Sequence, residues 1–159
     1  MLFKESCTQN ILPKNSLYFK EEDICEVLCL PPQKPNIENL LDILVWPEVK
    51  DIKIIETIEG TSEEGQNLTG VKLNIELKIK EKITYVANDL CQSVHSAHFE
   101  DLKSFFVILP KKINDRDVCD LVNSGRINVI PYVESVYGRM IDERTIHKCI
   151  LIFIDVKIC

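Results

Sequence analysis

The stretch that decides the fold is Val71–Ala87, which reads VKLNIELKIKEKITYVA. Every second residue from Val71 to Ala87 is apolar except Glu81, and the residues between them from Lys72 to Thr84 are polar. A period of two is typical of a β-strand that has one buried face and one solvated face. Seventeen residues is long for a single strand, so we expect a bend or a β-bulge near Glu81.

The rest of the chain contains further strand patterns separated by turn-forming residues. The other predicted strands lie at residues 51–59, 105–109, 127–140 and 149–158. Turn composition occurs at residues 60–65, 123–125 and 142–145. Strands and helices do not alternate along the chain. The sequence therefore predicts an all-β fold, an antiparallel β-sandwich or barrel with at most one or two short helical turns.

Residues 36–44 are ambiguous. Ile37, Leu40, Leu41 and Leu44 lie at helical spacing, and Asn36 is a suitable residue to cap a helix there. The same segment is equally compatible with an extended lead-in to the first strand of the main domain. Residues 111–121 are polar and admit one helical turn.

The first 29 residues are predicted to form an N-terminal arm, and residues 30–159 the main β-domain. Pro31, Pro32 and Pro35 follow the arm closely, which excludes a helix there and marks a boundary.

Length and charge limit the function further. The chain has 159 residues, of which 45% are hydrophobic and 28% are charged, so it can form one domain with a core that needs neither a disulfide nor a metal. Its net charge of −6 argues against non-specific binding of nucleic acid or anionic membranes. The chain starts without a signal-peptide pattern, and its longest apolar stretch is too short to span a bilayer. We therefore expect synthesis in the cytoplasm and no membrane insertion.

Motifs for catalysis are missing from the sequence. There is no GxSxG, P-loop or GxGxxG pattern, so we predict no catalytic residue, no cofactor and no metal. His95 and His98 would lie on opposite faces of a strand, which favours a hydrogen-bonded structural role over a metal pair. The acidic residues Glu59, Glu63 and Glu64 are better explained as a solvated turn than as a calcium site.

The seven cysteines allow three interpretations: buried apolar side chains, a zinc site, or disulfides between molecules. Zinc has little support, because there is no CxxC and Cys25 and Cys29 have no second pair nearby. Cys7 and Cys159 lie near the chain ends, where side chains are normally exposed. The candidates for intermolecular disulfides are Cys7, Cys25, Cys29 and Cys159. Such bonds need an oxidising setting, which a cytoplasmic product meets after release.

Several long motifs resemble a known family. They are GTSEEGQNLTGVKL (60–73), IKEKITYVAND (79–89), QSVHSAHF (92–99), FFVILP (105–110) and IPYVESVYGRMIDERTIHKCILIFI (130–154). Together they resemble the SPOCS-type domain of clostridial spore-coat morphogenesis proteins of the SipL kind, over residues 30–158. Those proteins also carry a LysM module, and the residues up to Cys159 do not include one, so we do not expect the bridging role of SipL-like proteins here.

The resemblance implies a β-rich module without catalysis and a role in sporulation. With the arm and the cysteines, it predicts a structural subunit of the spore surface, in a coat layer or an appendage fibre. Such a subunit would self-assemble through the arm by strand addition and be cross-linked by disulfides. Its partners would be further copies of itself and other spore-coat proteins. It would be made in the mother-cell cytoplasm and deposited on the spore surface.

Two other functions stay open at this point. One is a soluble adaptor that binds a spore-coat morphogenetic protein through the β-domain. The other is a carbohydrate-binding module, which has less support because most aromatic residues lie in apolar strand patterns.

Overall fold

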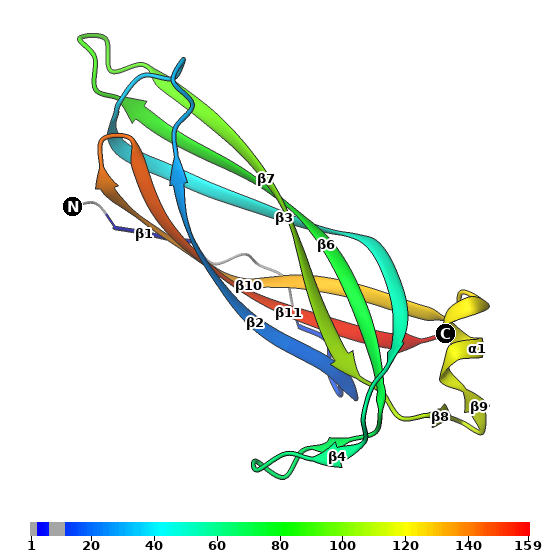
Figure 1. The fold of residues 1–159 in the computed structure, drawn as a ribbon. Coiled ribbons are helices and arrows are strands. Elements are labelled where there is room, and N and C mark those ends of the chain that lie inside the picture. The colour runs from blue at the N-terminus through cyan, green and yellow to red at the C-terminus, as the bar shows by residue number, and fades with distance from the viewer. Residues whose placement is uncertain (1–2, 7–11) are drawn as a thin grey trace.

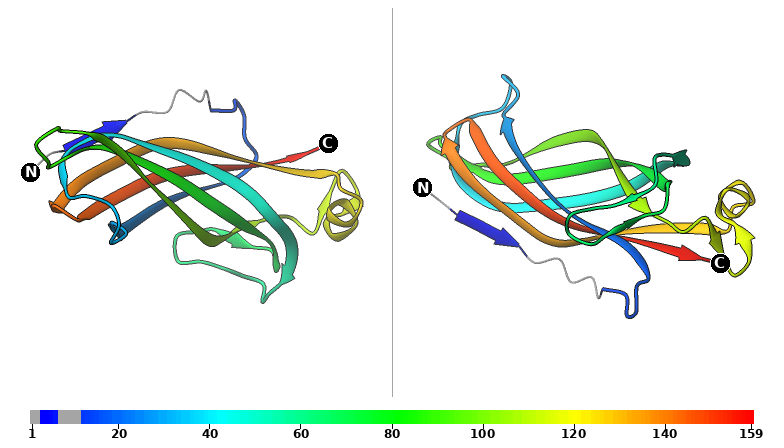
Figure 2. Two further views of the ribbon diagram at one scale, coloured as in Figure 1. Left: turned by 90° about the horizontal axis from the view of Figure 1, so that it is seen from above. Right: turned by 60° about the horizontal axis from the view of Figure 1, so that its bottom comes forward.

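Two antiparallel sheets pack face to face in an elongated molecule (Figure 1). The computed structural model describes residues 3–6 and 12–159. The four-stranded sheet has the order β1 (Phe3–Ser6), β10 (Ile127–Asp142), β11 (Thr145–Ile158) and β2 (Tyr18–Cys29). The three-stranded sheet has the order β3 (Ile37–Glu56), β6 (Val71–Ala87) and β7 (Val94–Ile108). Figure 2 shows the two layers from two further directions.

Smaller elements join these strands. Two short hairpins are formed by β4 (Gly60–Thr61) with β5 (Asn67–Leu68) and by β8 (Lys112–Ile113) with β9 (Arg116–Asp117). The six-residue helix α1 (Val118–Asn123) is capped by Asp117, whose side chain accepts a hydrogen bond from the backbone of Cys119. In the part of the chain that the structure describes, no helix is long and apolar enough to cross a membrane. The predicted all-β sandwich with a short helical turn is confirmed.

Strand β6 has the bounds and the two faces that its alternation predicts. The residues from Val71 to Ala87 alternate between buried and half-buried along the whole strand. The bulge expected near Glu81 is wrong, because the pairing of β6 with β7 is continuous. The register shifts lie in the pairing of β6 with β3, where β3 carries the extra residues. An edge strand can take up extra residues while disturbing one ladder only, whereas β6 is paired on both sides.

The helix considered for residues 36–44 is wrong, and the extended alternative is right. Strand β3 begins at Ile37, and two of its register shifts fall between Ile37 and Asp42. Each extra residue moves the next buried position by one, so the buried side chains are Ile37, Leu40 and Ile43. Bulges have thus produced a spacing of three in a strand, which imitates a helical pattern.

The arm expected for residues 1–29 is a strand of the main sheet from Tyr18 onward. Strand β2 pairs with β11 from Tyr18 opposite Val156 to Cys29 opposite Thr145. The proline-rich segment marks the end of a strand, and no separate unit ends there. Nearer the N-terminus, β1 pairs with β10 between residues 136 and 139.

The long strands give the molecule two distinct ends. At the hairpin end lie the loop 30–36, the β6–β7 hairpin and the β10–β11 hairpin. Asn88 joins these three elements, since its backbone donates a hydrogen bond to Asn36 O and its side chain donates to Glu143. At the helix end lie α1, the β8–β9 hairpin and the C-terminus, where Cys159 N donates to Arg126 O. Figure 1 shows the two ends at opposite sides of the sandwich.

Candidate functional site: the cysteines and their neighbours

Cys25 and Cys149 form a disulfide between β2 and β11. The two residues are direct partners in the antiparallel ladder, with Cα atoms 4.1 Å apart. The prediction that Cys25 offers a thiol to a neighbouring molecule is therefore corrected, because its sulfur is bonded within the chain. The sequence could not reveal this pairing, since 124 residues separate the two cysteines.

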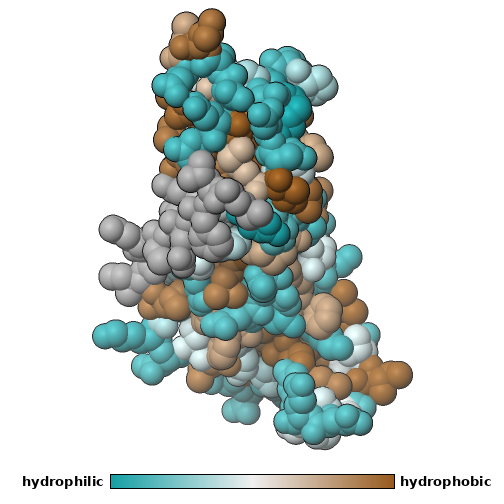
Figure 3. All heavy atoms as spheres, turned by 90° about the vertical axis from the view of Figure 1, so that its left-hand side faces the viewer, coloured by the Kyte–Doolittle hydropathy of each residue, from teal (hydrophilic) through white to brown (hydrophobic). Residues whose placement is uncertain are grey.

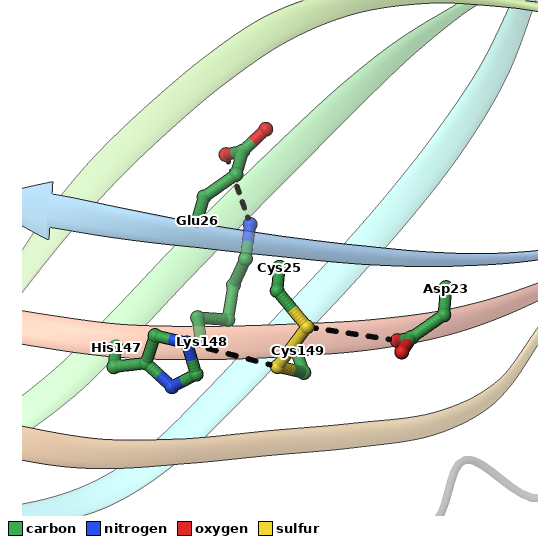
Figure 4. Close-up of a disulfide and its surroundings, with 6 residues drawn as sticks. All are labelled: Asp23, Cys25, Glu26, His147, Lys148 and Cys149. Atoms are coloured by element: carbon green, nitrogen blue, oxygen red, sulfur yellow. Dashed lines mark hydrogen bonds and ion pairs between the residues drawn. A yellow bond between two sulfur atoms is a disulfide. The ribbon is translucent and has the colours of Figure 1, made fainter.

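Two polar side chains lie beside the disulfide on the same face of the sheet (Figure 4). His147 Nε2 is 4.0 Å from Cys149 Sγ, and Asp23 Oδ1 is 3.8 Å from Cys25 Sγ. Each of these residues is two positions from the cysteine on its own strand, and residues at that spacing share a face. The ligand atoms of Cys25, His147 and Cys149 all lie within 4.8 Å of one another. This arrangement can either hold a disulfide or gather ligands for a metal ion.

Four of the described cysteines are free, and they are divided between the two ends of the molecule. The hairpin end carries Cys29, at the last position of β2, and Cys91, in the β6–β7 hairpin. The helix end carries Cys119, in α1, and Cys159 after β11. The predicted cross-linking residues Cys29 and Cys159 are both exposed and free, at opposite ends. Cys7 lies outside the described residues.

The free thiols differ in their surroundings. Cys29, Cys91 and Cys159 are exposed, whereas Cys119 is half-buried. Burial raises the pKa of the Cys119 thiol, and the neighbouring carboxylate of Asp117 raises it further. The thiolate is the reactive form of cysteine, so Cys119 is the least suited of the four to disulfide exchange.

The histidines and acidic residues singled out in the sequence are not brought together. His95 Nε2 lies 2.9 Å from Ser93 Oγ, and its ring stacks on Tyr85, as a hydrogen-bonded structural role predicts. Glu59 forms an ion pair with Lys111. Glu63 and Glu64 are exposed in the turn between β4 and β5.

A cluster of charges between the sheets was missed by the sequence analysis. Glu81 of β6 and Lys148 of β11 form a buried ion pair, with 3% and 0% of the side chains exposed. Lys148 Nζ is also 3.5 Å from Glu26 of β2, and Glu26 binds Lys103 of β7 at 2.9 Å. In the sequence, this cluster was indicated only by Glu81, which interrupts the apolar face of β6.

The electrostatics of this cluster follow from its burial. Burial raises the pKa of Glu81, while the ammonium group of Lys148 opposes that rise. The pKa of Lys103 is raised well above its usual range, because its ammonium group is hydrogen-bonded to Glu26 and Asp101. The cluster links four strands of the two sheets, and its central pair is buried, so we assign it a structural role.

No protein-family model, curated protein or solved structure matches the chain. The resemblance to the SPOCS-type domain therefore rests on the motifs quoted above.

Proposed function

We propose that the chain is a non-catalytic structural subunit of the bacterial spore surface, in a coat layer or an appendage fibre. Its copies join end to end and are cross-linked by disulfides. The observation that carries the assembly is the presence of exposed free thiols at both ends of the molecule, Cys29 and Cys91 at one and Cys159 at the other. The spore location rests on the resemblance of the quoted motifs.

The distance between the ends supports bonds between molecules. Strand β11 has 14 residues and runs from the partner of Cys29 to the residue before Cys159. At about 3.3 Å per residue it separates the two thiols by about 45 Å. A disulfide requires Cα atoms within about 7 Å, so a bond between Cys29 and Cys159 must join two molecules. A contact between two different ends that does not close on itself produces a filament.

The surface of the hairpin end supports such a contact. Val27, Leu90, Val94 and Ile141 lie at or near this end and are 56%, 105%, 61% and 47% exposed. Figure 3, which views the molecule from the hairpin side, shows small hydrophobic groups set among hydrophilic ones. A second molecule seated on this end would cover these four side chains.

Strand β1 offers a second link between subunits. It pairs with the edge of β10 at residues 136–139, and the same backbone hydrogen bonds can be made to β10 of a neighbour. The start of β2 lies near the helix end, because Tyr18 is opposite Val156. We propose that the chain between β1 and β2 carries β1 across the contact, from the helix end of one subunit to the β1-binding edge near the hairpin end of the next.

Electrophoresis and electron microscopy test the proposal together. The purified, oxidised protein should give a ladder of reducible species on a non-reducing gel and filaments or sheets by negative stain. Cys159→Ser should abolish the ladder, and so should the double variant Cys29→Ser with Cys91→Ser, because each removes the exposed thiols of one end.

Cys119→Ser is the matched control and should leave the ladder unchanged, since this thiol is half-buried and its pKa is raised. Monomer-sized particles in every condition would overturn the proposal. That outcome would favour the soluble adaptor, and a search for a morphogenetic partner would follow.

A further inference from the structure

We propose that Cys25, Cys149 and His147 bind a zinc ion when the two cysteines are reduced, with the carboxylate of Asp23 as the fourth ligand. The zinc and the disulfide then exclude each other on the outer face of the four-stranded sheet. This inference does not depend on the assembly proposed above, because it concerns cysteines that take no part in the contact between the ends.

The backbone holds three of the four side chains close together, since the ligand atoms of Cys25, Cys149 and His147 lie within 4.8 Å of one another. Cys25 and Cys149 are direct ladder partners, and Asp23 and His147 lie two residues away on the same face, on opposite sides of the cysteine pair. Ligand atoms around a tetrahedral zinc ion are about 3.3–3.8 Å apart, given Zn–S bonds of about 2.3 Å and Zn–N bonds of about 2.0 Å. The separations of 4.0 Å between His147 Nε2 and Cys149 Sγ and of 3.8 Å between Asp23 Oδ1 and Cys25 Sγ are close to that. Side-chain rotation after reduction is the main change that the site requires.

The disulfide state leaves polar groups of this cluster without good partners. A disulfide sulfur carries no proton, so Cys25 cannot donate to Asp23, and Cys149 cannot donate to His147. His147 Nδ1 is buried and has no hydrogen-bond partner among residues 12–159. With the ring proton on Nδ1, the lone pair of His147 Nε2 faces the sulfur of Cys149 and is free to bind a metal. Zinc would give this lone pair a partner, and the carboxylate of Asp23, which is exposed to solvent, is available as a further ligand.

The chemistry of the donor set favours zinc. Two sulfurs, one imidazole nitrogen and one carboxylate oxygen suit a borderline-soft ion with tetrahedral geometry. The nearby ammonium group of Lys148 does not compete, because it points to the inner face, where it pairs with Glu81. Figure 4 shows its second partner, Glu26. Cys25 is exposed, and His147 and Cys149 are half-buried, so an ion can reach the site from solvent.

The two states are connected by a balanced reaction. A phosphine reductant and one water molecule convert the disulfide to two thiols, and the phosphine becomes its oxide. Zn²⁺ then replaces the two thiol protons, which are released to solvent. Removal of two electrons from the two thiolates by a disulfide oxidant re-forms the Cys25–Cys149 bond and expels the ion.

Cobalt and zinc titrations of the full chain test this site. The protein is reduced with a phosphine and transferred to oxygen-free buffer, and Co²⁺ alone is added as the spectroscopic probe. We expect a thiolate-to-cobalt charge-transfer band in the near ultraviolet and strong visible bands of tetrahedral Co²⁺, both bleached by Zn²⁺. The oxidised protein should give neither band. Zinc should also slow alkylation of Cys25 and Cys149, measured by mass spectrometry.

Variants separate this site from the other thiols. His147→Gln keeps both thiols and should weaken Co²⁺ binding about tenfold or more, while Cys149→Ser should remove most of the charge-transfer band. If Cys149→Ser does not fold, His147→Gln still decides the question. Cys91→Ser and His95→Gln are matched controls and should titrate like the wild-type protein. The proposal fails if the reduced wild-type protein gives no charge-transfer band, or if His147→Gln and Cys149→Ser both bind Co²⁺ as the wild-type protein does.

Discussion

Lys148 of β11 and Glu81 of β6 form an ion pair in the space between the two sheets. Each lies on the buried face of its strand, at a position where the alternation calls for an apolar residue. Glu81 lies between Ile79 and Ile83, and Lys148 lies between Ile146 and Ile150. Glu26 of β2 pairs with both Lys148 and Lys103 of β7, so the ion pairs extend from the core to the edge strands of the two sheets. Two isolated charges would be costly in such a core, so the two sheets can pack in this register only when these positions meet.

Lys148→Met should therefore be strongly destabilising. It removes the ammonium group that pairs with Glu81, and an unpaired buried charge typically costs about 3–5 kcal/mol. The double variant Glu81→Leu with Lys148→Met should recover most of the loss, because the apolar faces of β6 and β11 become continuous. Urea denaturation measures both free energies of unfolding. Lys50→Met, in an exposed pair with Glu48, is the control and should change stability little. Equal effects of Lys148→Met and Lys50→Met would contradict a desolvated pair.

The same pair should give stability a distinctive dependence on pH. Burial raises the pKa of Glu81 above 4.5, so the folded protein binds more protons than the unfolded chain between 4.5 and the folded-state pKa. The free energy of unfolding should then rise as the pH falls from neutral through the folded-state pKa, and this contribution should level off below 4.5. Asp89 and Asp142 act in the opposite sense, because hydrogen bonds lower their pKa below 3.8 and stability is lost as they become protonated. Glu81→Gln should lack the rise. Parallel slopes for the two proteins, measured by urea denaturation at each pH, would refute the assignment.

The sequence predicted those parts of the fold in which the strand period is undisturbed. Strand β6 is central, paired on both sides and free of bulges, so each residue from Val71 to Ala87 keeps its expected face. Strand β3 is an edge strand with three register shifts, and its buried residues no longer follow a period of two. A pattern-based prediction fails at residues 36–44 because the partner strand decides where the extra residues fall.

The disulfide and the buried ion pair each join residues that are distant in the sequence, so their partners could not be predicted from it. Cys25 and Cys149 are 124 residues apart, and Glu81 and Lys148 are 67 apart. The sequence indicated only that Glu81 interrupts the apolar face of its strand. The antiparallel pairing of β2 with β11 brings Cys25 and Cys149 together, with Asp23 and His147 beside them. The prediction of an N-terminal arm did not include this pairing, because it left β2 outside the main sheet.

Gly138 of β10 allows the sheets to approach closely, and this gives a further prediction. A Cβ atom at this position would overlap Ile43 Cδ1 of β3, and Ile43 is only 1% exposed. Gly138→Ala should therefore cost about 1–3 kcal/mol through overpacking. Ile43→Val removes the overlapping methyl group, so the double variant should be more stable than the sum of the two single changes predicts. Thermal and urea unfolding of the four proteins give the coupling energy. Gly60→Ala is the control, since no atom lies within 4 Å of its Cβ position. Strict additivity would show that Ile43 does not limit the space at Gly138.

Truncation separates the part of the N-terminal region that folds the domain from the part proposed to join subunits. Removing residues 1–16 deletes β1 and its connection but leaves β2, which begins at Tyr18 and pairs with β11. This variant should keep the far-ultraviolet circular dichroism of the full chain, and in the presence of reductant it should run as a monomer that forms no filaments. Removing residues 1–29 also deletes the buried Ile24 and the Glu26 partner of Lys148, and it exposes β11 as an edge, so it should not fold. Size-exclusion chromatography and negative-stain microscopy distinguish these outcomes. Filaments formed by the shorter deletion in reductant would mean that β1 does not connect the subunits and that the contact between the ends is sufficient for assembly without a disulfide.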